Sequence, residues 1–201
     1  LTKHRRHKRI VRISRVLILL AFLLIWELTA RAGIIDSFIF SSPTKIALCF
    51  FGMLLDKSIF LHLGVTLYET LLSFLLVIAI SILVAVALWF SSKLSEILDP
   101  YLVVLNSLPK SALAPLLIVW LGATKTTIIV AGMSVAIFGS ILSLYTSFTV
   151  VDPGKIKLIY TLGGNRFHAL SKVVLPSPIP AIISNMKVNI GLCLVGVIIG
   201  E

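Results

Sequence analysis

Residues 71–90, LLSFLLVIAISILVAVALWF, hold no charged side chain. A helix needs roughly 20 mainly apolar residues to cross a hydrocarbon core about 30 Å thick, so this stretch is long enough to span a membrane. Residues 126–151 also lack a charge, and 16–26 form an apolar run that continues past Glu27. Small residues such as Gly132 let helices approach closely inside a bundle. We therefore expect an all-α, polytopic helical membrane protein.

The composition of the whole chain favours a membrane protein over other classes. Its 201 residues are 58% hydrophobic and 13% charged, whereas soluble domains average about 25% charged residues. The chain is too apolar to be disordered, and its two cysteines are too few for a disulfide scaffold. The net charge of +10 comes from basic residues gathered at the start and between apolar runs. A nucleic-acid binder would spread them over a folded surface, so we expect no nucleic-acid partner and a multi-pass protein of the cell membrane.

Two of the predicted spans carry polar groups that would be costly against lipid. A central lysine costs on the order of 2.5–3.5 kcal/mol on insertion scales. We expect these groups to face protein or a water-filled path, with snorkelling of the two lysines as the alternative. The candidate pathway residues are Asn106, Lys110, Asn185, Lys187 and Asn189. The transmembrane region covers 16–201, with spans over 16–34, 64–90, 101–121, 126–150 and 179–200.

The basic residues predict the orientation, because cytoplasmic loops carry an excess of Lys and Arg. Residues 1–15 form a basic tail with seven such side chains, so we expect a cytoplasmic N-terminus. Five spans then leave 12 of the 18 basic residues on the cytoplasmic side. Between the first two spans, Ser42 and Pro43 predict a helix start. A short apolar helix over 46–55 follows, at the outer interface.

The sequence shows no catalytic or cofactor-binding motif. The four histidines lack metal-ligand spacing, and the acidic residues are scattered singly rather than paired for acid–base chemistry. Residues 122–126 lack the spacing of a phosphate-binding loop. We therefore expect no enzyme, no cofactor and no metal, and any ATP that drives the protein must bind another polypeptide. Glu27 and Glu69 lie at or in span ends, where a salt bridge is favoured over a proton relay.

The cytoplasmic segment 152–180 is the most informative part of the chain. Asp152 can cap a helix that begins at Pro153. Apolar residues then recur along one helical side, and the glycine turn at 163–165 interrupts them. These residues are Ile156, Ile159, Leu162, Phe167 and Leu170. Because a loop between spans needs only a few residues, we interpret the segment as two short amphipathic helices that meet a partner protein.

This segment resembles the cytoplasmic loop of binding-protein-dependent ABC-transporter permeases. The loop pattern is Glu-Ala-Ala, three residues, Gly, nine residues, an aliphatic residue, one residue and Leu-Pro. Positions 157–159, Gly163, Val173 and Leu175-Pro176 fall on this spacing. From about residue 41 to residue 201, further motifs resemble the nitrate/sulfonate/taurine/bicarbonate group of these permeases. They are His62-Leu63, Asp99-Pro100, Leu108-Pro109, ALAPLLIVWLG at 112–122, Val151-Asp152-Pro153 and Lys172-Val-Val-Leu-Pro176.

The resemblance implies a permease subunit of an ATP-driven importer for a small anion or small organic solute. It also implies a second permease subunit in a homodimer, cytoplasmic ATPase subunits and an extracytoplasmic solute-binding protein. The loop 152–176 would be the coupling helix that meets the ATPase. Its implied coupling residues are Lys157, Leu158, Ile159, Leu162, Gly163, Phe167, Leu175 and Pro176. Since 157–159 are not Glu-Ala-Ala, either the ATPase groove has changed in compensation or coupling is degraded.

Members of this family normally continue into at least one more span. We therefore expect five spans of a six-span subunit in these 201 residues. The alternative is an ion-coupled secondary transporter that works without an ATPase, which would want inverted repeats and paired intramembrane carboxylates. An intramembrane enzyme would need a nucleophile or a metal set near the middle of the bilayer. The sequence shows neither set of features.

Overall fold

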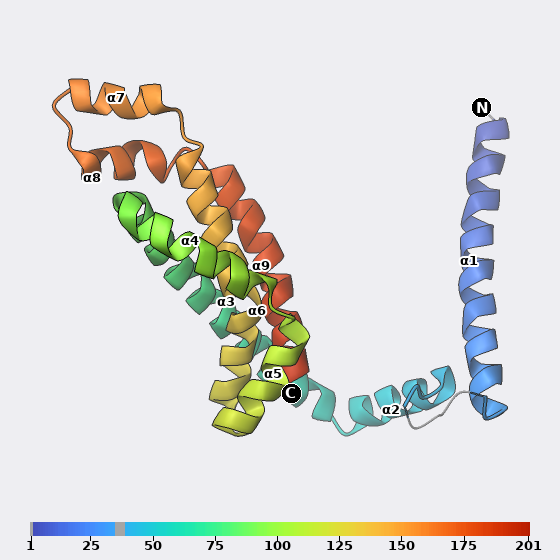
Figure 1. Cartoon of the computed structure of the whole chain (residues 1–201). Helices are drawn as coiled ribbons and strands as arrows, with labels where there is room; N and C mark the ends of the chain where they lie inside the picture. Colours follow the sequence, from blue (N-terminus) through green and yellow to red (C-terminus); the bar gives the residue numbers. More distant parts are fainter. Residues whose placement is uncertain (1, 35–38) are drawn as a thin grey trace. The chain divides into compact units, whose positions relative to one another are not determined.

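The computed structural model describes residues 2–34 and 39–201, which form helices and no strand (Figure 1). Four of the described helices are long and apolar enough to cross a membrane, and a pair of helices bent by 98° adds a fifth if it crosses as one broken span. The expectation of an all-α polytopic fold is confirmed. The chain divides into two units, Leu1–Leu63 and Gly64–Glu201. The elements in order are α1 (Thr2–Arg31), α2 (Pro43–Leu55), α3 (Ser58–Phe90), α4 (Ser92–Ser107), α5 (Lys110–Leu121), α6 (Lys125–Thr149), α7 (Pro153–Thr161), α8 (Arg166–Ala169), the π-helical turn η1 (Leu170–Val174) and α9 (Ile179–Gly200).

In the first unit, Glu27 ties the end of α1 to the start of α2. One carboxylate oxygen accepts a bond from Arg31 Nε at 2.7 Å, and the other accepts from the backbone N–H of Thr44 at 3.0 Å. The salt bridge favoured for this residue is therefore present. Helix α2 begins as expected, with the Ser42 hydroxyl accepting from Lys45 N at 3.3 Å and Pro43 in the first turn.

Asp56 lies between α2 and α3 and prepares the start of α3. Its Oδ1 accepts bonds from the backbone N–H of Ser58 at 2.9 Å and from the Ser58 hydroxyl at 2.6 Å. These two bonds stabilise the carboxylate and lower the pKa of Asp56 below its ordinary value. The expected second span begins at 64, whereas α3 already begins at Ser58.

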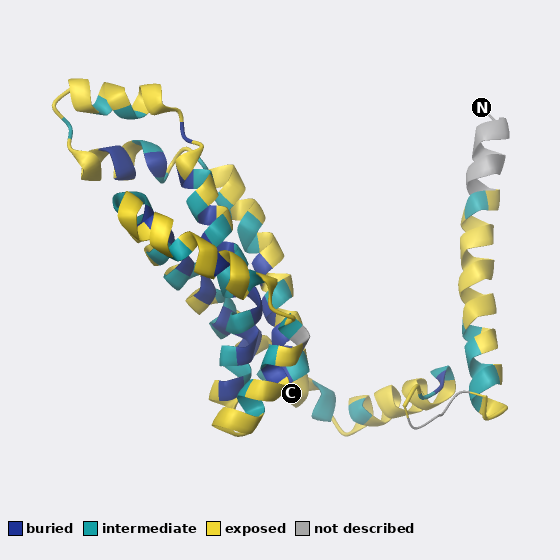
Figure 2. Ribbon diagram, viewed as in Figure 1, coloured by how far each residue is buried: buried dark blue, intermediate teal, exposed yellow. Residues whose placement is uncertain are grey.

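The second unit is built on buried residues at a spacing of four, most of them small, and this spacing places them on one face of each helix. Helix α3 buries such a stripe, and α6 buries a second one (Figure 2). Val77, Ala136 and Cys193 form a buried cluster that joins α3, α6 and α9. Small side chains let these helices pack closely without a large hydrophobic core. The two stripes are Glu69, Ser73, Val77, Ser81 and Ala85 on α3, and Gly132, Ala136 and Ser140 on α6.

Helices α6 and α9 pack tightly against each other at two glycines. A Cβ atom on Gly196 would lie 2.8 Å from the Cα of Gly132. A Cβ atom on Gly132 would lie 2.8 Å from Ser73 Oγ and 2.9 Å from Val197 Cγ2. Since backbone atoms cannot yield as a flexible side chain can, Gly196 is required by the packing.

The expected continuous span over 101–121 differs from the structure. Helix α4 begins earlier, at Ser92, and ends at Ser107, and the chain turns through 98° before it continues in α5. Leu108 is extended, with ψ at 144°. The physical cause is Pro109, which disfavours the helical conformation of the residue before it and has no N–H for the helix ladder.

Residues 152–178 form a knob, which Figure 1 shows at the end of the bundle opposite the C-terminus. Asp152 Oδ1 accepts from Gly154 N at 2.8 Å and caps α7 as expected. The chain then turns at Gly163, whose φ of +81° is a left-handed conformation that favours glycine. Asn165 Oδ1 accepts from His168 N at 3.0 Å and begins α8. The two short helices expected around the glycine turn are therefore present.

Gly196→Ala should lower the thermal unfolding midpoint of the purified protein in detergent, because the added methyl group would collide with the backbone of α6. Overpacking of this kind costs about 1–3 kcal/mol. Gly191→Ala is the matched control on the same helix, since a Cβ there meets nothing within 4 Å. Equal midpoints for the two variants would contradict the close crossing.

Candidate functional site

A polar cleft of about 500 Å³ lies in the second unit, where α4, α5, α6 and α9 contribute to its lining. Among its described lining residues, Lys110 carries the one formal charge, so the cleft is positive. Amides and hydroxyl groups supply the remaining polar surface. The polar lining residues are Asn106, Lys110, Ser143, Ser184, Asn185 and Asn189.

Ser140 is the hydrogen-bonding centre beside this cleft. Its Oγ accepts one bond from Asn185 Nδ2 at 3.1 Å and another from Asn189 Nδ2 at 2.9 Å. Asn189 is 2% exposed, so its side-chain amide is removed from water. The bond to Ser140 offsets the cost of burying this polar group. One residue before Ser140 on α6, a Cβ on Gly139 would lie 3.1 Å from Asn106 Oδ1. The absence of a side chain at Gly139 therefore lets Asn106 of α4 approach α6.

Four of the five candidate pathway residues line the cleft together, and Lys187 does not. Asn185 and Asn189 are four residues apart and share one face of α9. Lys187 is two residues from each, so it lies on another face of the helix, where it is exposed. Sequence reasoning did not assign Ser143 and Ser184 to the cleft. The signal for Ser143 is its spacing of four from Gly139 on α6.

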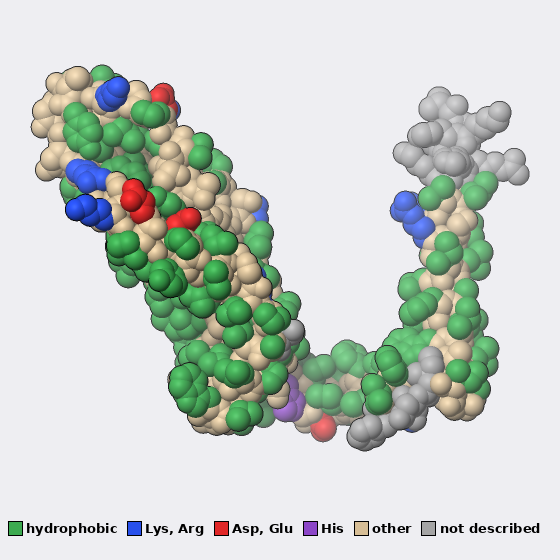
Figure 3. Space-filling model, in the orientation of Figure 1, with side chains coloured by type: hydrophobic (Ala, Val, Ile, Leu, Met, Phe, Trp, Pro, Cys, Tyr) green, Lys and Arg blue, Asp and Glu red, His purple; other side chains and the backbone are tan. Residues whose placement is uncertain are grey.

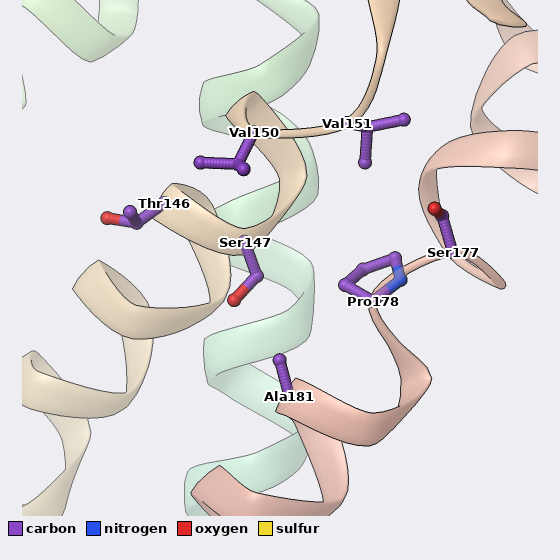
Figure 4. Close-up of a pocket in the computed structure, with 7 residues that line it drawn as sticks. All are labelled: Thr146, Ser147, Val150, Val151, Ser177, Pro178 and Ala181. Atoms are coloured by element: carbon purple, nitrogen blue, oxygen red, sulfur yellow. The ribbon is translucent and has the colours of Figure 1, made fainter.

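A second hollow of about 330 Å³ continues from the cleft toward the knob (Figure 4). Ala181 lines both hollows, so they follow one another along α6 and α9. Figure 4 shows Ser147 of α6 beside Pro178 and Ala181, at the start of α9. Ser147 is four residues after Ser143, which extends the small, polar side of α6. The lining residues are Thr146, Ser147, Val150, Val151, Ser177, Pro178 and Ala181.

The apolar residues of the knob separate into an inner and an outer set. Ile156 and Leu175 pack against the core cluster, and Leu170 is buried in it. In contrast, Leu162 is 76% and Phe167 65% exposed. The single apolar stripe expected from the sequence is therefore two surfaces, of which the outer one faces away from the bundle.

The remaining implied coupling residues divide in the same way. Lys157, Leu158, Gly163 and Pro176 are exposed, and Ile159 is half-buried. Figure 3 shows hydrophobic and basic side chains next to one another at this end of the bundle. The outer surface therefore offers apolar contact area flanked by positive charge. Interfaces between proteins combine these two features, with an apolar centre and a polar rim.

Arg166 fastens the knob to the last turn of α3. Its Nη2 donates to the carbonyl oxygen of Trp89 at 3.2 Å, and its guanidinium carbon lies 5.5 Å from the Trp89 ring and 5.8 Å from the Phe90 ring. A cation is favoured both over an aromatic face and at the C-terminal end of a helix. The buried Leu170 and Val174 add apolar anchoring beside it. Sequence reasoning missed this role, because nothing in the spacing places Arg166 beside 89–90.

Comparison with known proteins identifies the family. Residues 77–201, more than half of the chain, match the family of binding-protein-dependent transport system inner membrane components. The chain belongs to this family. The chain is 26% identical to a Bacillus subtilis protein named as an aliphatic sulfonates transport permease, over 88% of this chain and 64% of that protein. It therefore spans slightly less than two thirds of that relative.

Two further relatives of the inner membrane component support the same assignment. A Haemophilus influenzae protein named as an ABC transporter permease is 29% identical over 92% of this chain and 75% of its own length. The taurine transport system permease protein of Escherichia coli is 27% identical over 68% of this chain and 50% of its own length. The resemblance to ABC permeases of the sulfonate and taurine group is confirmed, and this is a family of transport components rather than of enzymes. Within the described residues, no group of three or more His, Cys, Asp or Glu side chains could hold a metal.

Arg166→Gln should loosen the knob of the inner membrane component at its junction with α3. A cation–π contact at an exposed site is worth about 0.5–1 kcal/mol, so hydrogen exchange of the α8 backbone should accelerate up to roughly fivefold. Lys155→Gln removes a positive charge from the same knob and should leave this exchange unchanged. Hydrogen exchange followed by mass spectrometry measures both variants, and equal protection in them would show that Arg166 does not fasten the knob.

Proposed function

We propose that this chain is the permease subunit of an ATP-driven importer, in which the polar cleft forms part of the solute path and the knob couples to a separate ATPase. The observation that carries the proposal is that the cleft and the knob share α6 and α9. The cleft lies between these helices, and the knob is the connection from the end of one to the start of the other. A displacement of the knob therefore reaches the lining of the cleft through two rigid helices.

The solute of this importer is a small anion or a small organic molecule of the nitrate, sulfonate or taurine type. Lys110 supplies a positive charge, and the amides of Asn106 and Asn185 can donate hydrogen bonds to oxyanions. A volume of about 500 Å³ falls within the range of small-molecule sites. The sulfonate and taurine relatives named above act on solutes of this chemistry.

The partners follow from the surfaces that the chain leaves uncovered. A second copy, in a homodimer, would shield the polar lining of the cleft, which is costly against lipid. ATPase subunits would receive the outer surface of the knob, and a solute-binding protein would deliver the solute from the other side. Since the basic tail at 1–15 favours a cytoplasmic N-terminus, the knob lies on the cytoplasmic side. ATP-driven closure of the ATPase pair would push the knob and rock the helices between outward and inward openings.

Lys110→Ala should lower anion uptake, because it removes the charge that lines the cleft. A hydrogen bond to a charged group contributes about 1.5–3 kcal/mol, which predicts a roughly tenfold or larger loss in uptake at low solute concentration. Uptake of radiolabelled taurine and of a short alkanesulfonate into proteoliposomes with the ATPase and the solute-binding protein measures this effect.

Lys187→Ala is the matched control for the uptake experiment. It removes the same charge from the same membrane region, but from the exposed side of α9, so uptake should persist. Lys110→Arg should retain most of the activity, since it keeps the positive charge. If Lys110→Ala and Lys187→Ala behaved alike, the cleft would not be the anion path.

Lys157→Glu should change the amount of ATPase that co-purifies with the chain, because it reverses a charge on the outer surface of the knob. Phe167→Ala should lower co-purification by removing exposed apolar contact area. Lys93→Glu makes the same charge reversal on α4, outside the knob, and should have no effect. Unchanged co-purification for both knob variants would place the ATPase contact elsewhere.

A further inference from the structure

A buried acidic side chain lies at the end of the bundle opposite the knob. Glu69 of α3 is 0% exposed, and among the described residues neither of its carboxylate oxygens has a hydrogen-bond partner. The neighbouring Thr70 hydroxyl is also buried and unpartnered within that same part of the chain. An ionised carboxylate without donors in such a site carries a large desolvation cost. The surroundings of Glu69 must therefore supply a proton or a positive charge.

The carboxyl group of Glu201, just after α9, faces Glu69. Thr66 donates its hydroxyl to the Glu201 carboxylate, whose two oxygens lie 2.8 and 2.9 Å away. Thr66 and Glu69 are three residues apart on α3, so they share a face, and Glu69 interacts with Glu201 there. Lys125, at the start of α6, is a cation that acts on Glu69, but it is exposed to solvent. A solvated ammonium group compensates a buried carboxylate weakly.

We propose that Glu69 and Glu201 form a proton-binding site, in which the two carboxyl groups share one proton. Two adjacent carboxylates repel each other, so uptake of one proton from water leaves the pair with a single negative charge. Glu69 then donates its O–H to the Glu201 carboxylate. Such a charge-assisted bond is short and about twice as strong as a neutral one. The Thr66 hydroxyl also donates a hydrogen bond to the Glu201 carboxylate and holds this acceptor in place.

The shared proton joins α3 to the end of α9 by a hydrogen bond. This bond lies at the end of the bundle opposite the knob. The buried stripe of α3 begins with Glu69, so the link closes the small-residue interface at this end. Loss of the proton would place two like charges across the same contact and open it. This inference goes beyond the proposed import function, and it holds whether or not an ATPase binds the knob.

Infrared spectroscopy of the purified chain in detergent tests the site directly. At neutral pH, the unmodified protein should show the carbonyl band of a protonated carboxyl group, shifted by exchange into heavy water. Glu69→Gln should abolish that band, since it removes the carboxyl group that carries the proton. Glu201→Gln should shift the band, since it replaces the charged acceptor of the Glu69 O–H with a neutral amide. Glu96→Gln removes an exposed carboxyl group from α4 and should leave the band intact. Absence of the band in the unmodified protein, or its persistence in Glu69→Gln, would overturn the proposal.

Thermal unfolding separates a proton from a metal cation as the shared ligand. Glu69→Gln should fold, because the amide of glutamine can donate to Glu201 in place of the shared proton. Raising the pH should then lower the unfolding midpoint of the unmodified protein more than that of Glu69→Gln. A midpoint that rises with sodium or calcium ions in the unmodified protein, and does not rise in Glu69→Gln, would show a metal site and overturn the proposal.

Discussion

The close contact between α6 and α9 is the constraint on which the second unit depends. Gly132 and Gly196 bring the two backbones together, and this contact fixes the distance between the polar residues farther along both helices. Ser140 can accept from Asn185 and Asn189 only at that separation. Packing between helices in a membrane gains little from the hydrophobic effect, so van der Waals contact and hydrogen bonds must hold them. The same pair of helices therefore provides both the stability of the bundle and the wall of the cleft.

The knob extends this rigid pair beyond the bundle. Its inner residues belong to the core cluster, and Arg166 adds a bond to the end of α3. Its outer residues make an apolar surface that the bundle does not need. Because its inner side chains pack into the core cluster, the knob is held to the helices on either side of it. The order of the elements along the chain places the knob directly between α6 and α9, so it is joined to two of the helices that line the cleft.

Local features of the chain were predictable from sequence wherever a residue type has one strong preference. Long uncharged runs predicted the spanning helices, and Asp152, Pro153 and Gly163 predicted where the knob begins and turns. The same reasoning predicted that Asn106, Lys110, Asn185 and Asn189 face protein or a water-filled path, and the structure brings these four residues together in the lining of one cleft. Lys187 does not line the cleft. The energetic cost of a charge in lipid indicates only that its side chain avoids lipid, whereas its position around the helix axis, two residues from Asn185 and Asn189, places it on another face of α9. The length of the apolar run over 101–121 did not predict the bend at Pro109, where a single residue interrupts the helix. The contact of Arg166 with Trp89 joins distant segments that no local pattern relates.

The break at Pro109 has an electrostatic consequence of its own. Helix α5 begins next to the cleft at Lys110, and Pro109 supplies no side-chain cap to its first turn. The opening amides of a helix have no partner within the helix, and the aligned peptide dipoles give that end about half a positive charge. This contribution belongs to the backbone, so it neither titrates nor swings away as an ammonium group does. A bend that first looks like an interrupted span thereby gives the cleft a fixed potential, one that substitution of a side chain leaves in place.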